Sequence, residues 1–126
     1  MKVVFMGTSA FAVPTLQRII DSSHQIMAVI SQPDRPSGRG GKLTPSPIKE
    51  LALKYSLRVF QPDRIKEPSA IQQVQAMEAD LIVVVSYGQI IPASILYYPR
   101  YGSINVHASL LPYYRGAAPI QRAIMA

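Results

Sequence analysis

The sequence contains no cysteine, so it offers neither a disulfide nor a thiolate ligand for a metal, and nothing argues for an oxidising compartment. No apolar run approaches the roughly 20 residues that a membrane-spanning helix needs, and the run Leu81–Val85 has the length of a strand. The chain opens on a strand-like run, without the basic segment, long apolar region and cleavage site of a signal peptide. We therefore expect a cytoplasmic protein without a membrane partner and without a bound metal ion.

Acidic residues are missing from the end of the chain. No aspartate or glutamate follows Asp80, whereas Arg100, Arg115 and Arg122 do, and the net charge is +6. Net charge bears on association rather than on fold, so this excess permits a polyanionic partner. Any carboxylate that a reaction needs near the later residues must come from the first 80 residues or from outside this chain.

Strand-like and helix-like stretches alternate along the 126 residues, a length typical of about one domain. This alternation predicts successive right-handed βαβ units and an open parallel sheet with flanking helices, an α/β, Rossmann-like fold. The expected strands are Lys2–Met6, Ile26–Ser31, Arg58–Phe60, Leu81–Val85 and Gly102–His107, and the expected helices are Phe11–Asp21, Pro47–Tyr55, Ser69–Met77 and Pro92–Tyr97.

Gly7, Thr8 and Ser9 follow the first expected strand, a position at which some α/β proteins bind a dinucleotide phosphate. The full fingerprint needs two further glycines, which this sequence lacks. We therefore favour a structural turn, with Thr8 or Ser9 capping the helix that follows.

The residues Asp34–Pro47 are rich in glycine and proline and predict a long loop with Arg35, Arg39 and Lys42 among them. The loop is either an ordinary solvated surface or a flexible basic arm that reaches phosphates. It has no aromatic residue between its charges, which favours contact with a nucleic-acid backbone over base stacking. Ser46 near its end is expected to cap the next helix.

Asn105 and His107 lie two residues apart at the end of the last expected strand, so both side chains project from one face of the sheet. Either residue alone is most often structural. Together they can divide the work of acyl transfer, because an imidazole relays a proton near neutral pH and an amide N–H stabilises an oxyanion. No serine, cysteine or lysine stands out as a covalent nucleophile, so direct transfer to a bound acceptor is favoured.

Apolar residues follow the neighbouring strand and also follow His107. They either pack in the core or form the walls of a site for a flat, partly aromatic ligand. These residues are Tyr87, Gly88, Ile90, Ile91 and Pro92 on one side, and Leu110, Leu111 and Pro112 on the other.

The stretch INVHASLLPYYRGAAPIQRAI resembles the signature of the folate-dependent formyltransferases, INVH-x-SLLP followed by RGAAP. The segments QPDRPSGRGGKLTPSPIKELA and LIVVVSYGQIIP narrow the resemblance to the members that formylate methionyl-tRNA, over nearly the whole chain from Lys2. The resemblance implies transfer of a formyl group from 10-formyltetrahydrofolate to the α-amine of methionyl-initiator tRNA in translation initiation. Family members that act on purine precursors or nucleotide sugars share the Asn and His but generally lack the basic loop.

The resemblance also implies roles for individual residues. Asn105 would polarise the formyl oxygen, and His107 would handle the proton of the attacking amine. Arg39 would reach the acceptor end of the tRNA, with Arg35 and Lys42 assisting. The residues implied to contact the folate are Ser109, Leu110, Leu111, Pro112, Tyr87, Gly88 and Ile91.

The sequence departs from the family pattern at two positions, with Tyr113 where arginine is usual and Ala10 where aspartate is usual. The family's third catalytic residue, an aspartate, and its tRNA-binding carboxy-terminal domain would lie beyond Ala126. We therefore expect residues 1–126 to be the amino-terminal part of a catalytic domain that is inactive alone and monomeric at full length. The alternatives are a formyltransferase for a small amine, such as a nucleotide sugar, and a non-catalytic RNA-binding Rossmann-like module.

Overall fold

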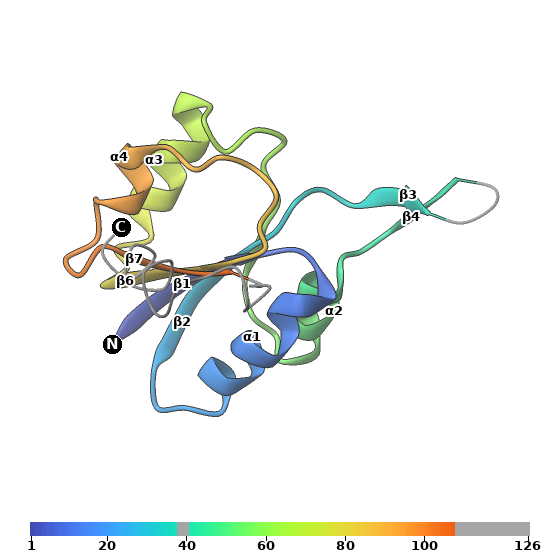
Figure 1. Ribbon diagram of the computed structural model, residues 1–126, viewed down its shortest axis with the longest axis horizontal. Helices are drawn as coiled ribbons and strands as arrows, with labels where there is room; N and C mark the ends of the chain where they lie inside the picture. Colours follow the sequence, from blue (N-terminus) through green and yellow to red (C-terminus); the bar gives the residue numbers. More distant parts are fainter. Residues whose placement is uncertain (38–40, 108–126) are drawn as a thin grey trace, which may run out of the picture.

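The computed structural model describes residues 1–37 and 41–107, which form a five-stranded parallel sheet and a separate two-stranded ribbon (Figure 1). In the sheet, β1 (Lys2–Gly7) is central, with β2 (Gln25–Ile30) and then β5 (Val59–Phe60) on one side. On the other side lie β6 (Leu81–Val85) and then β7 (Ser103–Val106). Every pairing in this sheet is parallel, which confirms the predicted α/β, Rossmann-like fold.

Helices cover both faces of the sheet. Helices α1 (Val13–Ile20) and α2 (Pro47–Lys54) lie on one face, and α3 (Pro68–Ala76) and α4 (Ala93–Leu96) lie on the other (Figure 1). Alternate residues of each strand therefore enter two different cores. In β1, Val3 and Phe5 join the core under α1 and α2, whereas Val4 and Met6 join the core under α3 and α4. The apolar run Leu81–Val85 is buried on both faces for the same reason.

The first helix differs from the prediction of one helix over Phe11–Asp21. A 3₁₀ turn, η1 (Ala10–Ala12), comes first, and α1 begins at Val13 with Pro14 in its first turn. Neither expected cap forms. Ser9 precedes η1 without a side-chain cap bond, and its Oγ lies 2.6 Å from Oγ of Ser86.

Thr8 makes a bond of the same kind, because its Oγ1 donates to the carbonyl oxygen of Tyr87 at 2.7 Å. Both hydroxyls thus bind the loop after β6 instead of the helix that follows them in sequence. Gly7 belongs to this junction as well. A Cβ placed on it would lie 2.7 Å from the carbonyl oxygen of Val85, so the two strands approach too closely for any side chain.

The start of α2 confirms the prediction made from Ser46 and Pro47. The Ser46 side chain accepts a hydrogen bond from the backbone N–H of Lys49 at 3.0 Å, and Pro47 occupies the first turn. This bond satisfies one of the N–H groups that a helix leaves unpaired at its start.

The segment predicted as a long loop contains a β-ribbon, so the prediction was wrong for these residues. Strands β3 (Arg35–Ser37) and β4 (Lys42–Thr44) pair antiparallel, with Arg35 opposite Thr44 and Ser37 opposite Lys42. We call β3 and β4 the ribbon; it extends away from the sheet and the four helices (Figure 1). The two strands have only three residues each, and β3 contains a proline, so they are too short to show the alternation of apolar and polar residues that usually indicates a strand.

Helices of the described part of the chain are all short. None of them has the length and apolar character required to cross a membrane.

Candidate active site

The order of the strands fixes where a site is expected. From β1 the chain proceeds outward through β2 to β5, then returns to the other side of β1 to form β6 and β7. The reversal lies between β1 and β6, and crevices at the carboxyl ends of such strands are the usual ligand sites of open α/β sheets. The residues that follow β1, β6 and β7 are therefore the candidates.

A cavity of about 450 Å³ opens at this edge of the sheet. Its walls come from the end of β6, the loop that follows, α4 and the end of β7. The lining residues are Val84, Ser86, Tyr87, Gly88, Gln89, Ile90, Ile91, Leu96, Asn105 and His107.

The structure thus brings six of the sequence-predicted site residues to one cavity, namely Asn105, His107, Tyr87, Gly88, Ile90 and Ile91. Two of the three predicted tRNA contacts, Arg35 and Lys42, lie on the ribbon instead. Other predicted residues lie outside the described part of the chain; these are Arg39 and Ser109, Leu110, Leu111 and Pro112.

The register between β6 and β7 explains how Asn105 reaches the cavity. Asn105 pairs with Val84, which belongs to the core under α3 and α4. Its neighbour Val106 pairs with Val85 and packs against the other core. Asn105 is half-buried and His107 is exposed, so the amide lies deeper in the cavity wall than the imidazole.

Tyr87 forms a buried part of the wall, with 2% of its surface exposed. Among the residues described, its hydroxyl finds no hydrogen-bond partner. Burial raises the pKa of Tyr87 to about 12, because the phenolate would lose its hydration. The side chain is therefore a neutral phenol throughout the physiological range.

The loop from Ser86 to Ile91 has an unusual backbone. Ser86 has a φ of 52° and Gly88 a φ of 103°, values that only glycine adopts without cost. The side chain of Ile90, beside the cavity, is 94% exposed. Strained backbone of this kind persists where the surroundings hold it, and it concentrates at functional sites.

A polar cluster holds the base of the ribbon beside this loop. The carboxylate of Asp34 accepts a bond from Nε2 of Gln61 at 2.7 Å and pairs with Nζ of Lys49 at 2.9 Å. The hydrogen bond from Gln61, followed by the interaction with Lys49, holds the pKa of the Asp34 carboxyl below its ordinary value of 3.8.

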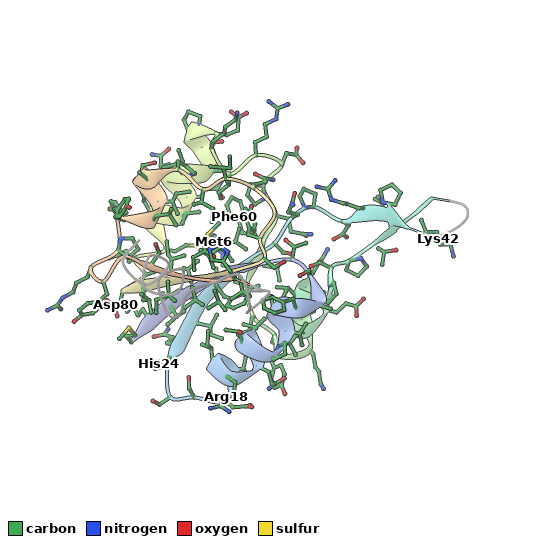
Figure 2. All side chains as sticks on the ribbon, in the orientation of Figure 1. Met6, Arg18, His24, Lys42, Phe60 and Asp80 are labelled. Carbon is green, nitrogen blue, oxygen red and sulfur yellow. The ribbon has the colours of Figure 1, made fainter. Side chains whose placement is uncertain are left out.

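The arrangement can support a polar reaction at a carbonyl group. It offers an amide, an imidazole and apolar walls, and the described part of the cavity lining contains no carboxylate. Asp80, the last acidic residue of the sequence, comes just before β6, at the opposite end of the strands from the cavity. Its carboxylate accepts a bond from the N–H of Lys2 at 2.8 Å (Figure 2). It is therefore not placed to support His107.

Comparison with known proteins gives the family. The formyl transferase family matches residues 1–126, the full length of the sequence. The chain belongs to this family. It is 59% identical over 125 residues to the methionyl-tRNA formyltransferase of Syntrophomonas wolfei, covering 99% of this chain and 40% of that protein. It is 56% identical over 126 residues to the methionyl-tRNA formyltransferase of Methylococcus capsulatus, covering 100% of this chain and 41% of that protein.

Solved structures of formyltransferases share the fold. Phosphoribosylglycinamide formyltransferase from Bacillus halodurans superposes with a TM-score of 0.61 at 19% identity, covering 98% of this chain and 64% of that one. A sugar N-formyltransferase from a Shewanella species superposes with a TM-score of 0.55 at 16% identity, covering 91% and 42%. At this identity the likeness shows the fold alone. Of the family members named, those that share most sequence with this chain act on methionyl-tRNA, which does not favour the small-amine alternative.

Proposed function

We propose that the protein containing this chain transfers a formyl group from 10-formyltetrahydrofolate to the α-amine of methionyl-initiator tRNA. One observation carries the proposal: an amide and an imidazole line one cavity in a chain 59% identical to a methionyl-tRNA formyltransferase. The chain spans 40% of that relative's length, so the proposal concerns the full-length protein.

Asn105 is the residue proposed to stabilise negative charge on the formyl oxygen. As the amine of the acceptor adds to the formyl carbon, charge moves onto this oxygen, and a fixed amide N–H donor lowers its energy. The strand β7 holds Asn105 in register with Val84, so the donor is positioned before the reaction begins. A group on a strand is held more precisely than one on a loop.

His107 is proposed to take the proton that the amine loses. A neutral imidazole at the cavity mouth accepts this proton and can return it to the departing nitrogen of the folate. The exposure of His107 suits a group that must meet an acceptor arriving from solvent.

The donor is proposed to lie against Tyr87, Gly88 and Ile91, with Ser109–Pro112 completing the site. A cavity of about 450 Å³ falls within the range of small-molecule sites, and its wall is largely apolar with few polar groups, as such sites usually are.

The ribbon is proposed to receive the acceptor end of the tRNA through Arg35, Arg39 and Lys42. Arg35 and Lys42 are exposed on strands that extend away from the sheet (Figure 1). Exposed cations are free to contact phosphates, and the binding energy that they contribute falls as the salt concentration rises.

Replacing His107 by alanine tests the proposal, and His24 gives a matched control because it is the only other histidine in the sequence. His24 comes just before β2, at the opposite end of the strands from the cavity, with Nδ1 2.9 Å from the amino group of Met1 (Figure 2). In the full-length protein we expect His107→Ala to lower the rate of formyl transfer by about 10² to 10⁴-fold. Affinity for tRNA should change little, and His24→Ala should keep the wild-type rate. A normal rate in His107→Ala, measured with radiolabelled methionyl-tRNA, would exclude this role.

A further inference from the structure

Gln32 lies at a junction that neither the proposed catalytic residues nor the proposed tRNA contacts explain. It follows β2 and comes three residues before Arg35, the first residue of the ribbon. Its backbone is fixed on both sides: its N–H donates to Oγ1 of Thr8 at 3.3 Å, and its carbonyl oxygen accepts from Nε2 of Gln61 at 3.1 Å. The side chain thus starts from an anchored position between β1 and β5.

The side-chain oxygen of Gln32 joins the ribbon to the cavity wall. Oε1 accepts from Nη2 of Arg35 at 2.7 Å and also from Nε2 of Gln89 at 3.2 Å. Arg35 belongs to β3, and Gln89 lines the cavity together with Asn105 and His107. One oxygen atom therefore connects two segments that are 54 residues apart in sequence.

Gln89 extends this hydrogen-bond network to the loop that forms the cavity wall. Its Nε2 also donates to the carbonyl oxygen of Asp63 at 2.9 Å, and its Oε1 accepts from the N–H of Ile65 at 2.9 Å. Both amide hydrogens and the oxygen of Gln89 are thus engaged, which fixes the side chain in one orientation. Loss of the bond to Gln32 would leave one of these hydrogens without its partner.

Gly88 receives the Gln32 side chain. A Cβ built on Gly88 would lie 2.1 Å from Nε2 of Gln32, so the amide occupies the space that any other residue would need. The contact lies where the φ of Gly88 is 103°, a conformation that glycine adopts without cost and other residues rarely adopt. Gln32 therefore supports this loop by packing as well as by hydrogen bonding.

We propose that Gln32 is a positioning residue that joins the acceptor-binding ribbon to the donor cavity. Through its Oε1, the position of Arg35 on the ribbon and the position of Gln89 in the cavity wall depend on each other. Contact of Arg35 with a tRNA phosphate then alters the wall against which the folate lies, and by linkage a bound folate alters Arg35. This inference rests on the proposed function and adds a physical path between its two substrates.

Two ribbon cations make a matched pair for the test. Arg35 bonds to Gln32, whereas Lys42 lies farther along the ribbon opposite Ser37 (Figure 2). In the full-length enzyme, Arg35→Ala and Lys42→Ala should both raise the KM for methionyl-tRNA. Arg35→Ala alone should also weaken binding of 10-formyltetrahydrofolate by about fivefold to tenfold, the size expected for loss of one ordinary hydrogen bond. Calorimetry without tRNA measures this affinity.

Variants of Gln32 test whether this residue links Arg35 on the ribbon to Gln89 in the cavity wall. Gln32→Leu should weaken donor binding as Arg35→Ala does, and the double variant should weaken it no further, because both changes break one connection. Gln32→Glu keeps an oxygen acceptor and should restore near-wild-type donor affinity. Gln17→Leu is the control, since Gln17 lies on α1 and bonds to Asp21 and Tyr55.

The outcomes separate this inference from the proposed function. A wild-type enzyme that neither binds the folate nor formylates methionyl-tRNA would contradict the function itself. If the enzyme is active but Arg35→Ala, like Lys42→Ala, leaves the affinity for the folate unchanged, the proposed role of Gln32 is wrong. Independent, additive effects of Arg35→Ala and Gln32→Leu on donor affinity would also overturn it. Because Arg35 is exposed, its variant tests the connection even if Gln32→Leu does not fold.

Discussion

The sheet and the ribbon are both built from strands, yet different interactions hold them. In β1 and β6 nearly every residue is buried, and helices cover both faces. In β4 every residue is exposed, including Leu43, and two paired strands alone are marginally stable in water. The order of the ribbon therefore depends on the polar contacts at its base, whereas the sheet depends on burial.

This difference suits the two proposed tasks. Catalysis requires groups fixed within a fraction of an ångström, and Asn105 is fixed by its register with a buried strand. Binding a large polyanion requires charge and reach more than precision, and an exposed ribbon supplies both. Substitutions in each region that change the free energy of unfolding therefore test how strongly the sheet and the ribbon are held.

Substitution of two glycines, one in the sheet and one beside the ribbon, should give the largest difference in the free energy of unfolding. A Cβ on Gly7 would meet the backbone oxygen of Val85 at 2.7 Å, so Gly7→Ala should destabilise the protein by about 2 to 3 kcal/mol through overpacking. A Cβ on Gly41, the residue just before β4 of the ribbon, meets no described atom within 4 Å. Its φ of 66° alone should make Gly41→Ala cost about 1 kcal/mol. Urea denaturation of the two variants and the wild type measures both values.

One result of this experiment would contradict the contrast between the sheet and the ribbon. If Gly41→Ala lowers the free energy of unfolding as much as Gly7→Ala does, the ribbon is part of the cooperative core. The contrast between a buried sheet and a polar-anchored ribbon would then be wrong.

In the buried region, a substitution of Tyr87 is expected to change the free energy of unfolding by less than Gly7→Ala does. Its buried hydroxyl has no partner among the described residues, so Tyr87→Phe should stabilise the protein at pH 7 by about 1 kcal/mol. The pKa of Tyr87 is raised from 10.0 to about 12 in the folded state, so the unfolded chain loses this proton first. The stability of the wild type is therefore unaffected by this group below pH 10 and falls as the pH rises from 10 toward 12. The variant should therefore lose less stability than the wild type over that interval.

A second tyrosine controls for the chemistry of the substitution. Tyr97, at the end of α4, is 63% exposed, so Tyr97→Phe should leave both the stability at pH 7 and the alkaline loss nearly unchanged. An alkaline loss in Tyr87→Phe equal to that of the wild type would contradict the assignment to Tyr87.

The parts of the fold that the sequence predicted are those with a local signal. The apolar run Leu81–Val85 predicted a buried strand, and Ser46 with Pro47 predicted a capped helix, because both patterns depend on neighbours in the chain. Asn105 and His107 reach one cavity for a similar reason, since alternation along a strand is a local property.

The parts that it missed depend on distant residues. Thr8 and Ser9 looked like helix caps, but they bond residues 79 and 77 positions away, where β1 and β6 meet. Gln32 and Gln89 are 57 positions apart and have no pattern that pairs them before the sheet forms. The ribbon was missed because its six residues have no core of their own to impose a pattern.

The smallest expected effect concerns Asp34 at the ribbon base. Its pKa lies below 3.8 in the folded state, through the bond from Gln61 and then that from Lys49. The resulting stabilisation is present above pH 3.8 and is lost as the pH falls through this lowered pKa. Asp34→Asn should therefore show a lower urea midpoint than the wild type at pH 6, and the difference between the two midpoints should shrink as the pH falls below 3.8. Lys49→Met removes the ion pair but keeps the bond from Gln61, so it should keep part of the acid dependence. If it abolishes the dependence as fully as Asp34→Asn does, the ion pair rather than the Gln61 bond holds the base of the ribbon.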